Sequence, residues 1–232
     1  MKTKLLIITI SLLQLCLSCS RNVNFSQEFI DKTSGRYLYT QDEILTVYYE
    51  KNTLFLNWRG AERLKPVVLD QNTIFVADMY KKLRFVEHPD TEEFYLATVD
   101  PEDEDLISYD YLKLADSAKI PSRHLLDGEF DKALSGYMKI KANDSTDILI
   151  DEGEFNRLGY QYLREKRYQN AIDVFKINVA LYPESSNVYD SLADAYLRSG
   201  DSLQAFNNYS KALELNNGNR RAKEYVEAYQ NK

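Results

Sequence analysis

The chain repeats itself once at a fixed shift. Residues 158–162 (Leu-Gly-Tyr-Gln-Tyr) align with residues 192–196 (Leu-Ala-Asp-Ala-Tyr), and the same shift aligns Ala171 with Ala205. Small and aromatic residues at fixed places in a period of about 34 residues are typical of stacked helical hairpins. The small residues let two helices approach closely, and the bulky residues fill the remaining space.

The shift defines two repeats, over 152–185 and 186–219. A half-repeat is expected before them, over 122–143, and a capping helix after them, over 220–231. Together they form a helical domain over 122–232. These repeats resemble tetratricopeptide repeats, and the resemblance implies an array that binds other protein chains and rarely performs chemistry.

In tetratricopeptide arrays the partner lies along the groove formed by the first helix of each repeat. The resemblance therefore implies a groove that binds a protein or peptide partner, formed by Asn156, Tyr160, Leu163, Asn187, Asp190, Asp194 and Leu197. Asp190 and Asp194 stand one helical turn apart on one face, so they would repel a carboxylate and favour a basic or amide-rich segment. The alternative is that Asp190 only caps a helix or forms a local hydrogen bond.

Before the helices, apolar residues alternate with polar residues from about Gly35 to Val99, which predicts short strands. A tight turn is expected at Lys51-Asn52, between the two strands with the clearest alternation, because Asn tolerates the left-handed conformation. The pattern predicts a small antiparallel β barrel or meander over 29–100, and the charged run 100–105 predicts a linker over 101–121. The fold class is therefore α+β. Further strands are expected at Leu64–Leu69, Thr73–Ala77, Lys82–Glu87 and Phe94–Val99.

The first residues have the pattern of an export signal. Lys2 and Lys4 precede an apolar run from Leu5 to Leu17, which is too short to span a bilayer comfortably. Leu17-Ser18-Cys19 resembles a bacterial lipoprotein cleavage site, with 1–19 as the signal peptide and Cys19 as the lipid attachment residue. The predicted location is the periplasmic side of a bacterial envelope, with membrane contact only through the lipid anchor. Ordinary cleavage would instead give a soluble periplasmic or secreted protein.

A second resemblance concerns the identity of particular residues and not only their spacing. It is carried by Asn156-x-Leu158-Gly159-Tyr160, Tyr182-Pro183-Glu184-Ser185 and Leu213-Glu214-Leu215-Asn216. These stretches look like the tail of beta-lactamase-type serine hydrolases of Bacteroidetes-like bacteria, which often end in a small β domain followed by such repeats. The nucleophile of that family stands in Ser-x-x-Lys, which does not occur in this sequence. We therefore expect the accessory region without the enzyme.

Composition disfavours two classes of function, nucleic-acid binding and metal binding. The formal net charge of −7 disfavours nucleic-acid binding, and the two histidines lack the spaced ligands of a metal site. No cofactor is expected. The two resemblances imply two alternative functions: a non-catalytic envelope scaffold for a protein partner, or an accessory or substrate-presenting subunit of a separately encoded serine hydrolase. A sheet face that binds a ligand through Tyr37, Tyr39, Tyr48 and Tyr80 is a lesser alternative.

Overall fold

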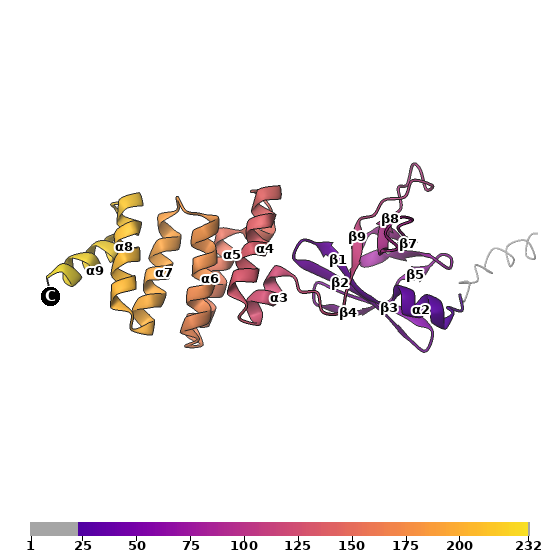
Figure 1. Ribbon diagram of the computed structural model, residues 1–232, viewed down its shortest axis with the longest axis horizontal. Helices are drawn as coiled ribbons and strands as arrows, with labels where there is room; N and C mark the ends of the chain where they lie inside the picture. The colour runs from indigo at the N-terminus through magenta and orange to yellow at the C-terminus, as the bar shows by residue number, and fades with distance from the viewer. Residues whose placement is uncertain (1–22, 232) are drawn as a thin grey trace, which may run out of the picture. The chain divides into compact units, whose positions relative to one another are not determined.

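The computed structural model describes residues 23–231, so the predicted signal peptide and Cys19 lie outside the described residues. The chain divides into two compact units, Met1–Ala118 and Lys119–Lys232 (Figure 1). The described part of the first unit is a curled antiparallel sheet preceded by one helix, and the second unit is helical.

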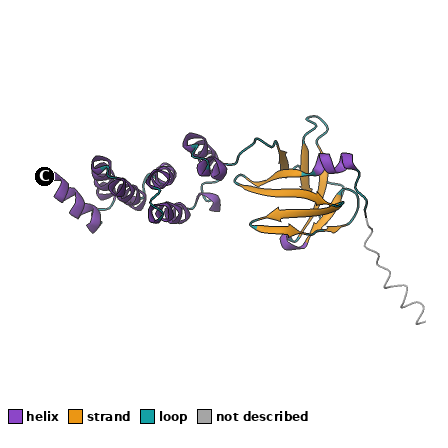
Figure 2. Cartoon of the chain, turned by 90° about the horizontal axis from the view of Figure 1, so that it is seen from below, coloured by secondary structure: helices purple, strands orange, loops and turns teal. Residues whose placement is uncertain are grey.

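The sheet runs in the order β4-β3-β2-β1-β9-β8-β7-β6-β5. Neighbouring strands are antiparallel, and the edge strands β4 and β5 do not pair with each other within the described residues. The sheet is therefore a curled half-barrel rather than a closed barrel (Figure 2). The strands are β1 (Gly35–Thr40), β2 (Glu43–Glu50), β3 (Thr53–Trp58), β4 (Ala61–Leu64), β5 (Val67–Val68), β6 (Thr73–Val76), β7 (Lys81–Glu87), β8 (Phe94–Thr98) and β9 (Tyr111–Leu114).

Local chemistry explains the turns between strands. Lys51 and Asn52 both have left-handed φ angles, of 48° and 63°, which confirms the predicted turn between β2 and β3. The single strand expected over Leu64–Leu69 is wrong. Pro66 lacks an N–H for a strand ladder, so the stretch divides into the end of β4 and the short strand β5.

The expected linker over 101–121 contains part of the sheet. Within it, β9 pairs with β1 through Arg36 and Leu114 and with β8 through Leu96 and Tyr111. The charged run is therefore an excursion between β8 and β9 and not the end of the sheet. Sequence periodicity missed β9 because only its first residue is buried.

A short helix, α2 (Gln27–Thr33), covers the sheet core, and no predicted element corresponds to it. Its N-cap is Ser26, whose hydroxyl accepts a hydrogen bond of 3.1 Å from the N–H of Phe29. The Phe29 ring packs edge-on against Phe85, with 5.8 Å between ring centroids. The hydroxyl of the fully buried Tyr37 donates to the carbonyl of Thr33 over 2.7 Å, which joins α2 to the sheet.

The second unit consists of stacked helical hairpins. The helices α5 and α7 begin at 152 and 186, and α6 and α8 begin at 168 and 202, so both starts recur at the shift that the sequence shows. A single helix, α9, follows α8. The helices are α3 (Pro121–Leu126), α4 (Phe130–Asn143), α5 (Glu152–Arg164), α6 (Tyr168–Leu181), α7 (Ser186–Ser199), α8 (Ser202–Leu215) and α9 (Arg220–Gln230), with a short 3₁₀ turn at Ile148–Ile150.

The segment expected as a half-repeat over 122–143 folds as a hairpin of its own, α3 with α4, with a short first helix. The second helices α4, α6 and α8 begin at 130, 168 and 202, so the first interval is longer than the second. The additional length falls in the connection that contains the 3₁₀ turn. This offset explains why the sequence period alone did not align this hairpin with the other two.

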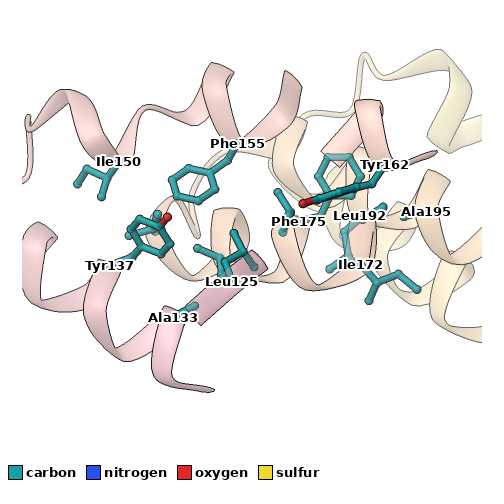
Figure 3. Packing of buried hydrophobic residues seen from close by; sticks show 14 of the residues in the cluster. Leu125, Ala133, Tyr137, Ile150, Phe155, Tyr162, Ile172, Phe175, Leu192 and Ala195 are labelled. Carbon is teal, nitrogen blue, oxygen red and sulfur yellow. The ribbon is translucent and has the colours of Figure 1, made fainter. Parts of the chain in front are cut away.

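Close packing of the helices depends on residues at equivalent positions of the two repeats. A Cβ atom on Gly159 would lie 2.5 Å from the Phe175 ring, so α5 and α6 approach more closely than a side chain there would allow. Tyr137 and Phe155 point toward one another, edge to face, with 4.9 Å between their ring centroids (Figure 3). Buried aromatic and small residues therefore join the first hairpin to the second.

Candidate functional site

The residues predicted to bind a partner come from α5 and α7, the first helices of two consecutive hairpins. The helix α9 follows α8, where the first helix of another hairpin would stand. Its residue Arg221 contacts residues of both α5 and α7. We call the surface of Asn156, Tyr160, Asn187, Asp190, Asp194, Leu197, Arg198 and Arg221 the α5–α7–α9 face.

The most extensive contact on this face joins α9 to α7. The guanidinium of Arg221 donates from Nε to Oδ1 of Asp190 over 3.3 Å and from Nη2 to Oδ2 of the same carboxylate. The Nδ2 atom of Asn219 also donates to Asp190 Oδ1, over 3.0 Å. Arg221 reaches α5 as well, because its Nη2 atom lies 3.5 Å from the hydroxyl of Tyr160. One side chain therefore bridges all three helices.

Asp194 forms the second charged contact. Its Oδ1 atom accepts from Nε of Arg198, one turn later on α7, over 3.0 Å. Its Oδ2 atom lies 3.7 Å from Nη1 of Arg221 and has no hydrogen-bond partner in the described part of the chain. Asp194 is only 6% exposed and Asp190 only 9%. Both carboxylates lie beneath arginine side chains.

Three expectations about the groove are therefore wrong. Asp190 and Asp194 do not present free negative charge, because Arg221 and Arg198 neutralise them and cover them. The alternative that Asp190 caps a helix or bonds locally is not what the structure has either, because its three bonds come from Arg221 of α9 and Asn219 at the N-cap of that helix, which are distant in sequence. Leu163 is 4% exposed and belongs to the helical core, because it lies on the side of α5 that packs inward.

The other predicted residues lie nearer the surface. Leu197 is 38% exposed, and Asn187 is exposed and donates to Oε1 of Glu152 over 2.9 Å. Tyr160 is half-buried and packs edge-on against Phe175. Asn156 is also half-buried, and its Oδ1 atom has no partner within residues 23–231. The accessible surface is thus polar and amide-rich, with one exposed leucine.

Sequence reasoning missed both arginines, although the signals for them were present. Arg221 stands one repeat shift after Asn187, so the period itself assigns it to the same helical position. Arg198 follows Asp194 by one helical turn, which is the spacing of an ion pair on one helix face. The side chains of Arg221 and Arg198 are 47% and 53% exposed, so the charge that this face presents to solvent is positive.

The charges stabilise one another. Burial lowers the pKa of the Arg221 guanidinium, but its bonds to Asp190 and Tyr160 raise that pKa more, and the net pKa lies above the ordinary value. The bond to Asp194 likewise raises the pKa of Arg198. Beneath them, burial is the main cause that raises the pKa of Tyr209 to about 12. Both arginines therefore stay charged, and Tyr209 stays neutral, at physiological pH.

The described residues also bear on three other kinds of site. Residues 23–231 contain no group of three or more His, Cys, Asp or Glu side chains placed to hold a metal ion. None of the helices in that range combines the length and apolar character needed to cross a bilayer. The four tyrosines of the expected sheet face differ in environment: Tyr37 is fully buried, Tyr39 and Tyr48 are half-buried, and Tyr80 is 88% exposed.

Comparisons with known proteins give limited similarity. No family model and no curated protein matches the chain. Among solved structures, it is similar to the first TPR of Spaghetti (RPAP3) bound to an HSP90 peptide, with 20% identity, TM-score 0.34, and coverage of 48% of this chain and 85% of that chain. It is also similar to MamA, with 22% identity, TM-score 0.34, and coverage of 48% of this chain and 64% of that chain. The first TPR domain of human RPAP3 matches with 20% identity, TM-score 0.34, and coverage of 48% and 84%.

The class of the helical unit is defined by its own geometry. Paired helices of similar length recur at the fixed shift of the sequence, and the final single helix covers the last pair. This is a tetratricopeptide-like array.

Proposed function

We propose that the protein is a non-catalytic scaffold whose helical unit holds a segment of another protein on the α5–α7–α9 face. The observation that carries this proposal is the bridge that Arg221 forms to Asp190 and Tyr160. It fixes three successive first helices as one surface before any partner arrives. A surface fixed in advance loses less conformational entropy when it binds.

The exposed groups of the face support a particular partner chemistry. The two Nη groups of Arg198 make no hydrogen bond within residues 23–231, whereas the carboxylates beneath are occupied. Asn187 adds an exposed amide and Leu197 an exposed apolar contact. An extended segment with acidic or amide side chains would satisfy these donors, in place of the basic segment that the sequence favoured.

Crosslinking tests the scaffold directly. A photoreactive amino acid is placed at Leu197 of the full-length protein in cells, and at Leu203 on α8 as a control, because Leu203 is 56% exposed but lies on a second helix. We expect a discrete crosslinked partner from position 197 only. Arg198→Glu should then abolish it through charge repulsion. Identical products from both positions, or none from 197, would contradict the proposal.

The location is a separate proposal. We propose that the chain is exported and anchored in the envelope through a lipid on Cys19, which is supported by the apolar run before it and the small residue Ser18. Mass spectrometry of the mature N-terminus checks this. Cys19→Ser should release the protein from the membrane fraction, and an unchanged distribution together with an unmodified N-terminus would contradict the anchor.

The accessory role beside a separately encoded serine hydrolase stays a hypothesis that rests on the sequence resemblance alone. If it holds, the partner crosslinked at position 197 contains a Ser-x-x-Lys motif. A partner without a hydrolase motif would leave the general scaffold standing and exclude this particular role.

A further inference from the structure

The half-barrel has two different ends. The strands β2 and β7 run between them, and α2 covers the end where these strands finish, because its Thr33 hydroxyl hydrogen-bonds that of Tyr49 and its Phe29 ring packs on Phe85. Residues Glu43 and Lys81 begin the same two strands and therefore lie at the opposite end. Among the described residues of the first unit, no α-helix packs over that end, but the short 3₁₀ turn Ala77–Met79 lies there just before Lys81, and Met79 packs against the sheet core.

Three aromatic side chains from three strands gather at the end where β2 and β7 begin. Tyr39 on β1 stacks on Tyr111 of β9 with 4.9 Å between ring centroids, and packs edge-on against Trp58 of β3 at 5.4 Å. Tyr39 and Trp58 are half-buried, so part of each side chain faces solvent. We call Tyr39, Trp58 and Tyr111 the aromatic mouth.

The polar groups in the mouth are mostly hydrogen-bond donors. The Lys81 ammonium donates to the Tyr111 hydroxyl over 2.9 Å but forms no salt bridge with any described carboxylate. The Asp110 carboxylate acts on it electrostatically, but that carboxylate already accepts from the Thr98 N–H and the Ser108 hydroxyl, each over 2.6 Å.

The indole N–H of Trp58 is an unsatisfied donor in the aromatic mouth. It is buried and has no acceptor in the described structure. A buried donor without a partner costs about 1–3 kcal/mol, so such groups are uncommon unless something else satisfies them. The mouth therefore holds an ammonium group that forms no salt bridge within the described residues and a donor without an acceptor, next to aromatic side chains.

Arg59 bounds the mouth on one side. Its guanidinium lies 4.9 Å from the centre of the Trp58 ring and donates to both oxygens of Glu43, over 2.8 and 3.0 Å. Glu43 is thereby neutralised. The charge left in the mouth is the Lys81 ammonium, so a cationic ligand would be repelled and a neutral hydrocarbon would leave that charge without a salt bridge.

We propose that the aromatic mouth binds a ring-shaped ligand that carries a carboxylate, of the uronic-acid class of sugars. The apolar face of the sugar ring packs on the exposed parts of Tyr39 and Trp58, and the carboxylate pairs with Lys81. The site lies wholly in the β unit and is independent of the α5–α7–α9 face.

The chain offers a reporter for this site, because Trp58 is its only tryptophan. The full-length protein is titrated with trigalacturonic acid, and in parallel with its methyl ester, in which each carboxylate loses its charge and gains a methyl group. We expect a saturable change in tryptophan fluorescence with the acid and at least about tenfold weaker binding of the ester. Equal binding of acid and ester, or no saturable change with either, would overturn the proposal.

Variants provide a matched test. Lys81→Met should weaken binding of the acid by about tenfold or more, and Lys81→Arg should keep it. Lys82→Met is the control, because Lys82 points to the other face of β7 and pairs with Glu104. Unchanged binding by Lys81→Met would overturn the assignment. Tighter binding of the trimer than of galacturonic acid itself would identify a polysaccharide, and equal binding would identify the free sugar acid.

Discussion

Arg221 and Asp190 form a paired contact between the last helix and a helix one repeat earlier. Two nitrogens of the Arg221 guanidinium face the two oxygens of the Asp190 carboxylate, and Asp190 is 9% exposed. Paired bonds of this kind fix orientation as well as distance. The contact therefore sets where α9 lies against α7, and the array ends in a fixed position.

Removing one partner of this pair should destabilise the helical unit. We expect Asp190→Asn to lower the free energy of unfolding by about 1–3 kcal/mol, because it leaves the half-buried Arg221 guanidinium poorly paired. Urea denaturation followed by circular dichroism measures the change.

The neighbouring arginine is the control. The side chain of Arg220 is 90% exposed, so Arg220→Gln should change the unfolding free energy by less than about 0.5 kcal/mol. Equal effects of Asp190→Asn and Arg220→Gln would show that the pair does not hold α9.

The sequence period predicted the helices well because the residues that set it are the residues that pack. Ala171, Ala205 and Tyr209 are almost fully buried, and their spacing follows from helix geometry alone. The charge of the candidate site could not be predicted in the same way. It depends on Arg221, which is distant from Asp190 in the sequence and close to it only after the array has folded.

The sheet was less predictable for a related reason. A strand that is half-exposed shows weak alternation, and β9 carries a single buried residue, Tyr111. Its place between β1 and β8 is set by pairing with strands far away in sequence. The helix α2 is too short for a reliable periodic signal, and it is held by Tyr37 and Phe85 of the sheet.

The close approach of α5 and α6 gives a second prediction. Gly159→Ala should lower the free energy of unfolding by about 1–3 kcal/mol, because the new methyl group would overlap the Phe175 ring. The aligned position in the next repeat is Ala193, which is fully buried. Ala193→Gly should cost only about 0.5–1 kcal/mol, through backbone entropy. A thermal-melt comparison checks both, and a stabilised Gly159→Ala variant would contradict the packing argument.

A third prediction concerns the turn inside each hairpin. The equivalent positions Gly128, Lys166 and Gly200 have left-handed φ angles of 75°, 59° and 93°. Lysine is strained in that region, so Lys166→Gly should raise the unfolding free energy by about 0.5–1 kcal/mol. The reverse substitution, Gly200→Lys, should lower it by about 1 kcal/mol. Denaturant midpoints measure both changes, and two changes of the same sign would contradict the strain argument.

The cluster around Glu129 gives a pH-dependent prediction. Hydrogen bonds from Lys119 first, then from His124 and Lys132, lower the pKa of Glu129 from its ordinary 4.5 to about 2. The folded state therefore binds this proton more weakly than the unfolded chain does. The stability contributed by Glu129 is present above pH 4.5 and is lost as the pH falls toward 2.

Glu129→Gln should consequently be less stable than the natural protein at neutral pH, and the difference should shrink steadily between pH 4.5 and about 2. Urea denaturation at a series of pH values measures this difference. Because Lys119 is the largest cause of the lowered pKa, a Lys119→Met background should reduce the pH dependence of the Glu129→Gln effect. A difference that stays constant down to pH 2, or that grows as the acid is added, would show that the carboxylate charge of Glu129 does not stabilise the first hairpin.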